Sequence, residues 1–117
     1  MKVDLSYLRE MSGGSKELVT EMISIFKSQV VEFSNEMDQL LQDKQYLLLG
    51  RLAHKAKSSV SIMGMEGLAS RLKDLEESTR DSRNIEAYAA IVEEFKKETG
   101  DAVKELNVVI NNIDLYI

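Results

Sequence analysis

The chain of 117 residues contains no cysteine, no proline and no tryptophan, and it contains a single histidine. The lack of cysteine excludes disulfide bonds and thiolate metal sites. The lack of proline means that no fixed ring interrupts a helix. The chain also has no apolar run of the roughly 18 residues that a membrane span needs, and its first residues lack the apolar region of a signal peptide. We therefore expect a cytoplasmic protein without membrane insertion.

Charge and size limit the possible functions further. Twenty acidic residues outnumber fifteen basic residues, and the formal net charge of −5 disfavours a broad attraction to nucleic acid or to anionic membranes. With 44% apolar residues, a chain of this length can bury one modest core, which predicts a single domain over residues 1–117. The seven-residue repeat is not strict enough for a long coiled coil, and we expect a monomer.

Five stretches with helical periodicity are separated by short polar or glycine-containing breaks. The break at residues 43–45 is so short that the helices on either side of it must be antiparallel. Gly100 falls inside the last stretch, but the apolar repeat keeps its phase there, so this helix should continue. The sequence predicts an all-α fold, an antiparallel four-helix bundle with a short additional N-terminal helix. The expected helices cover residues 5–11, 16–42, 46–63, a stretch from Gly64 to about residue 80, and residues 85–113.

The single histidine, His54, lies in the third of these helices. At about 100° per residue, the apolar residues of this helix form one stripe centred on Ala56, and His54 lies about 160° away from it. The ring should therefore face solvent or a partner. An exposed apolar patch beside a reactive residue is typical of a docking surface. The residues expected on or beside the exposed side are Leu47, Gly50, Arg51, Ser58, Ser61 and Ile62.

The residues around His54 resemble those of a known family. Ala53, His54, Lys57, Ser59 and Gly64, followed by Leu68, Leu72, Leu75 and the pair Glu76-Glu77, are similar to the pattern of the histidine phosphotransfer (Hpt) domain of two-component phosphorelays. Ala56 stands where the family usually has leucine, and Ser58 where it usually has glycine. Residues 3–9 and Asp43, as a capping acid, are similar too, so the resemblance covers most of the chain.

The resemblance implies a phosphocarrier without independent catalytic activity. His54 would reversibly accept a phosphoryl group from the aspartate of a response-regulator receiver domain and donate it to such an aspartate. Imidazole offers an unprotonated nitrogen near neutral pH, and the outward Nε2 is the expected acceptor, although the sequence leaves the choice of nitrogen open. The receiver would supply Mg²⁺, so the domain needs no cofactor of its own.

Two further roles follow from the same resemblance. Lys57 lies three residues after His54, where its ammonium group can stabilise phosphate oxygens by charge. The residues expected on the exposed side would contact the receiver, namely Leu47, Gly50, Arg51, Ser58, Ser61 and Ile62. A hybrid histidine kinase is a further candidate partner.

Two other functions compete with the phosphocarrier. A metal site in the core of a bundle would use Glu-x-x-His pairs, but Arg51 stands three residues before His54 and no second histidine exists. A non-catalytic Hpt-like module, which binds a receiver or a kinase without phosphotransfer, stays open because Ala56 and Ser58 depart from the family pattern. The presence of both His54 and Lys57 favours phosphotransfer.

Overall fold

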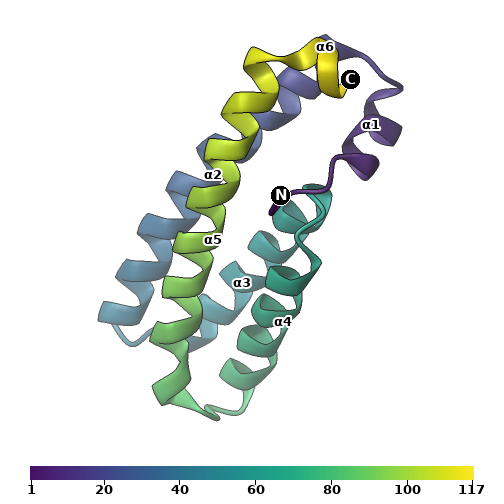
Figure 1. Cartoon of the computed structure of the whole chain (residues 1–117). Helices are drawn as coiled ribbons and strands as arrows, with labels where there is room; N and C mark the ends of the chain where they lie inside the picture. Colours follow the sequence, from purple (N-terminus) through teal and green to yellow (C-terminus); the bar gives the residue numbers. More distant parts are fainter.

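A computed structural model describes all 117 residues, which form six helices and no strand. Figure 1 shows the four long helices as an elongated bundle, with the short α1 and α6 near one end. The predicted four-helix bundle with a short additional N-terminal helix is confirmed, and α6 is a further four-residue helix that the sequence pattern did not indicate. The helices are α1 (Ser6–Ser12), α2 (Lys16–Gln42), α3 (Tyr46–Ile62), α4 (Glu66–Arg80), α5 (Ile85–Asn111) and α6 (Ile113–Tyr116).

Local interactions explain where the helices begin and end. The side chain of Ser15 accepts a hydrogen bond from the backbone N–H of Leu18 at 3.2 Å and caps the start of α2. Asp43 does not cap α3, because it ends α2 and its carboxylate accepts a hydrogen bond from Gln39. Helix α5 continues through Gly100, as the phase of the apolar repeat predicted.

Gly64 connects α3 to α4 and also contacts the N-terminal segment. Its φ of 73° lies in the left-handed region, which glycine adopts at little cost. A Cβ atom at this position would lie 2.7 Å from the backbone oxygen of Asp4, so a side chain would push the N-terminal segment away. Asp4 instead donates its backbone N–H to the oxygen of Met63 at 2.9 Å, which holds this segment against the end of α3.

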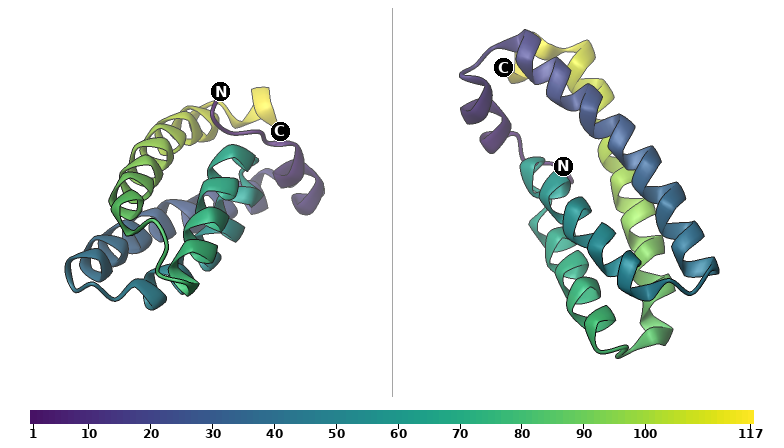
Figure 2. Two further views of the ribbon diagram at one scale, coloured as in Figure 1. Left: turned by 90° about the horizontal axis from the view of Figure 1, so that it is seen from below. Right: turned by 180° about the vertical axis from the view of Figure 1, so that it is seen from behind.

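The four long helices bury their apolar stripes in one core. In α3 the predicted stripe is buried, since Leu49, Ala53 and Ala56 are fully inaccessible and Leu52 is 5% exposed. The view from behind in Figure 2 shows α2 beside α5 and α3 beside α4, and the contact between α3 and α4 is the most extensive one. Burial of this stripe fixes the rotation of α3 and so determines which residues it presents outward. None of the helices has both the length and the apolar run that crossing a membrane requires.

Gly50 allows α3 and α4 to pack closely. A Cβ atom built on Gly50 would overlap Oγ1 of Thr79 and lie 3.1 Å from Cβ of Thr79. The prediction that Gly50 lies on the exposed side of α3 is therefore wrong, because Gly50 is buried under α4. Helical periodicity places it near His54 correctly, but it carries no information on which neighbouring helix covers that position.

Candidate functional site

His54 lies at the middle of α3 with its side chain 60% exposed, as the periodicity predicted. Its Nδ1 atom is 2.9 Å from Oε1 of Glu76, a residue of α4 that is only 14% exposed. A carboxylate only accepts hydrogen bonds, so this contact places the proton of the neutral ring on Nδ1. Nε2, the other ring nitrogen, is then the one with a free lone pair.

Two cations also contact the carboxylate of Glu76. The Nζ atom of Lys57 lies 3.5 Å from Oε2, and Nη2 of Arg80 lies 3.2 Å from Oε1. Burial raises the pKa of Glu76, but the hydrogen bond from His54 and the attraction of its cationic partners outweigh it and leave this pKa below its ordinary value of 4.5. Glu76 is therefore an ionised, well-partnered carboxylate beside the ring.

The ring of His54 stands between two hollows of the surface. The first, which we call the α2-side groove, lies between α2 and α3. Its lining includes Met22, Ile25, Phe33, Lys55, Ser58 and Ile62. The second, which we call the α4-side depression, lies between α3 and α4. It is lined by Leu47, Gly50, Arg51, His54, Lys55, Glu76, Thr79 and Arg80.

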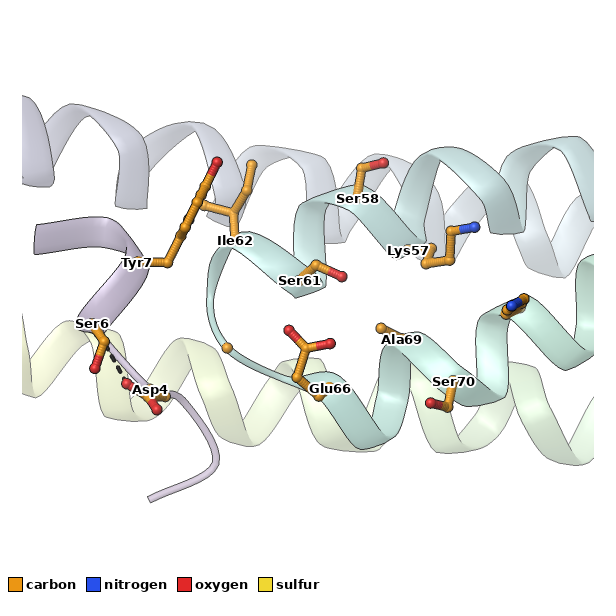
Figure 3. A pocket seen from close by; sticks show the side chains of 12 residues that line it. Asp4, Ser6, Tyr7, Lys57, Ser58, Ser61, Ile62, Glu66, Ala69 and Ser70 are labelled. Carbon is orange, nitrogen blue, oxygen red and sulfur yellow. Dashed lines mark hydrogen bonds between the residues drawn. The ribbon is translucent and has the colours of Figure 1, made fainter. Parts of the chain in front are cut away.

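Lys57 belongs to neither of these hollows. It lies at one end of a third groove, lined mostly by polar residues, which we call the N-terminal groove because Asp4, Ser6 and Tyr7 form its other end (Figure 3). Ser58 and Ser61 of α3 and Glu66 of α4 also line this groove. Lys57, which the sequence predicted to lie beside His54, therefore contacts the same carboxylate as His54, that of Glu76. Its side chain nevertheless lines a different part of the surface.

The family model of the Hpt domain matches residues 21–110, which extend from the first turns of α2 almost to the end of α5. The chain is an Hpt domain. Hpt domains are phosphotransfer carriers of phosphorelays rather than catalysts. No curated protein and no solved structure matches the chain.

The six residues predicted to dock a receiver lie on three different parts of this Hpt domain. Leu47, Gly50 and Arg51 line the α4-side depression, where Leu47 is 54% exposed and Gly50 is buried. Ser58 and Ile62 line the α2-side groove. Ser61 lines only the N-terminal groove.

The sequence reasoning missed three contributors to the site of this Hpt domain, namely Glu76, Arg80 and the α2 residues of the groove. Glu76 was noted only as part of the resemblance to the family. A usable signal existed, since Glu76 directly follows Leu75 and flanks the buried stripe of α4, where a side chain can reach a neighbouring helix. Arg80 had a signal as well, because it lies four residues after Glu76 in the same helix, the spacing at which an acidic and a basic side chain pair.

Proposed function

We propose that His54 of this Hpt domain reversibly carries a phosphoryl group between the aspartates of response-regulator receiver domains. The observation that supports this best is the orientation of the ring, whose Nδ1 lies at Glu76 while the side chain is 60% exposed, so that Nε2 is the free nitrogen. The lone pair of Nε2 attacks the phosphorus of an aspartyl phosphate, the N–P bond forms as the P–O bond breaks, and the aspartate leaves as a carboxylate. Transfer to a second receiver follows the same path in reverse.

Glu76 acts on this step through charge. Nδ1 keeps its proton when Nε2 is phosphorylated, so the ring becomes a cation, and the carboxylate 2.9 Å away stabilises that cation. Mg²⁺ would be bound by the receiver domain, and the Hpt domain would need no cofactor of its own. The cytoplasmic location and the monomeric state stay predictions.

The receiver docks over the α2-side groove in this proposal. The groove adjoins His54 and contains apolar side chains, of which Ile25 is 52% exposed. An exposed apolar patch of this kind marks an interaction surface. Lys55 lies at the same rim, and Arg51 lies across the ring in the α4-side depression. Their positive charges complement the acidic site of a receiver and favour its approach.

A pair of α2 variants tests this docking site. Ile25→Ser should weaken the binding of the receiver, whereas Val31→Ser, which changes a 62% exposed residue outside the groove, should leave binding unchanged. Equal affinities of the two variants in a binding titration would place the docking surface elsewhere.

The phosphotransfer itself is tested with receiver domains from the source genome that have been charged with acetyl phosphate. Each charged receiver is mixed with the Hpt domain, and the label that reaches the Hpt domain is treated with acid and with base. We expect a label that acid removes and base spares, as for phosphohistidine, and none on His54→Gln. A receiver that binds without labelling the wild type would instead support the non-catalytic interaction module. Label retained on His54→Gln would exclude His54 as the acceptor.

A further inference from the structure

The two oxygens of Glu76 have different partners. Oε2 contacts only Lys57, at 3.5 Å, whereas Oε1 is shared between Nδ1 of His54 at 2.9 Å and Nη2 of Arg80 at 3.2 Å. The guanidinium group of Arg80 is therefore separated from the ring of His54 by a single oxygen atom. Lys57 is bound to the other oxygen of the same carboxylate.

The two cations also face different parts of the surface. Arg80 lines the α4-side depression together with His54, whereas Lys57 lines the N-terminal groove, which does not include His54 (Figure 3). The side chain of Arg80 is 65% exposed, and that of Lys57 is 27% exposed. Arg80 is therefore the more accessible of the two cations.

We propose that Arg80, rather than Lys57, binds the phosphoryl oxygens when His54 is phosphorylated. This inference rests on the proposed function of His54. A phosphoryl group adds roughly 1.5 to 2 negative charges near neutral pH and three acceptor oxygens. Guanidinium has five N–H donors in a planar fork, so Arg80 can keep one bond to Glu76 and offer the others to the phosphoryl group.

Glu76 explains why Arg80 is better placed for this role than the other cations of the α4-side depression. Arg51 and Lys55 are exposed and line the same hollow, but no ion pair holds either of them beside the ring. The carboxylate of Glu76 holds both the ring, through Oε1, and Arg80, through the same atom. A donor that is already positioned loses less conformational entropy when it binds. We therefore assign the contact with the phosphoryl group to Arg80, whereas the sequence pattern predicted it for Lys57.

The test uses phosphoramidate as a small phosphoryl donor, so no receiver is needed. The phosphorylated domain is titrated by ³¹P NMR, which reports the apparent pKa of the phosphorylated ring. The positive charge of a bound guanidinium disfavours the proton of this ring, so Arg80→Ala should raise this pKa by roughly 0.5 to 1 unit. Arg80→Lys should restore part of the effect, and Lys57→Ala, which removes the other cation of Glu76, should have a much smaller effect.

The Glu76→Gln background separates direct contact from an effect through Glu76. If Arg80 binds the phosphoryl group, Arg80→Ala should raise the pKa of the phosphorylated ring in this background as well, because only the phosphoryl group then holds Arg80 near the ring. A shift that vanishes there would overturn the inference, as would a shift with Lys57→Ala that equals that of Arg80→Ala.

The failure of this inference is distinguishable from the failure of the proposed function. A wild-type domain that receives no label on His54 from phosphoramidate or from any charged receiver contradicts both. A wild-type domain that is labelled on His54 while Arg80→Ala leaves the pKa of the phosphorylated ring unchanged contradicts only the role of Arg80.

Discussion

Nδ1 of His54 and Oε1 of Glu76 lie 2.9 Å apart, although the two residues belong to different helices. In the proposed mechanism the carboxylate stabilises the ring cation that forms during phosphotransfer, so Glu76→Gln should slow the transfer from a charged receiver. A hydrogen bond to a charged group contributes about 1.5–3 kcal/mol, which corresponds to a rate lower by roughly tenfold to hundredfold. Single-turnover labelling measures this rate, and circular dichroism checks that the helices persist. A wild-type rate in Glu76→Gln would show that the contact has no part in the transfer.

The same carboxylate predicts a pH dependence of stability. The native pKa of Glu76 is below its ordinary value of 4.5, so its ionised form stabilises the fold fully above about pH 4.5. This contribution is lost as the pH falls through the native pKa. The free energy of unfolding of the wild type should therefore exceed that of Glu76→Gln at neutral pH, and the difference should shrink towards about pH 3. Urea unfolding at several pH values measures this difference between the two proteins. A difference that grows in acid would contradict the role of Glu76 as a stabilising, ionised carboxylate.

Two glycines within helices should respond in opposite ways to alanine. Gly50→Ala places a methyl group against Thr79 and should destabilise the fold by roughly 1–3 kcal/mol, as overpacking does. Gly100→Ala meets no atom within 4 Å and should stabilise α5 by about 0.5–1 kcal/mol. Denaturant unfolding compares the two variants. In the double variant Gly50→Ala/Thr79→Ala, most of the stability lost in Gly50→Ala should be recovered. A destabilisation that persists in the double variant would mean that Thr79 is not its cause.

The orientation of α3 is tested by two leucines of the same helix. Leu52 is 5% exposed, so Leu52→Ala should lower the free energy of unfolding by roughly 2–5 kcal/mol through lost burial and a residual cavity. Leu47 is 54% exposed, and Leu47→Ala should change the free energy of unfolding by no more than about 0.5 kcal/mol. Chemical denaturation gives both values. The opposite ranking would mean that α3 is rotated and that His54 faces the core.

Local patterns in the sequence determined the main framework of this Hpt domain. The absence of proline, the apolar stripes and the short breaks predicted the four long helices and their antiparallel order. The same periodicity placed Leu52 inward and His54 outward, and the structure confirms both. These properties depend on the spacing of residues within one helix, which is local information that the sequence carries directly.

The residues that surround His54 were decided only by the packing of one helix on another. Gly50 was expected at the surface, but α4 covers it, and the absence of a Cβ atom there brings Thr79 close to α3. Glu76 reaches the ring from this closely packed helix, and Arg80 of the same helix binds Glu76. Periodicity defines the direction of a side chain relative to its own helix axis. It does not define the distance, rotation and axial position of the neighbouring helix, and these three quantities determine which atoms meet at His54.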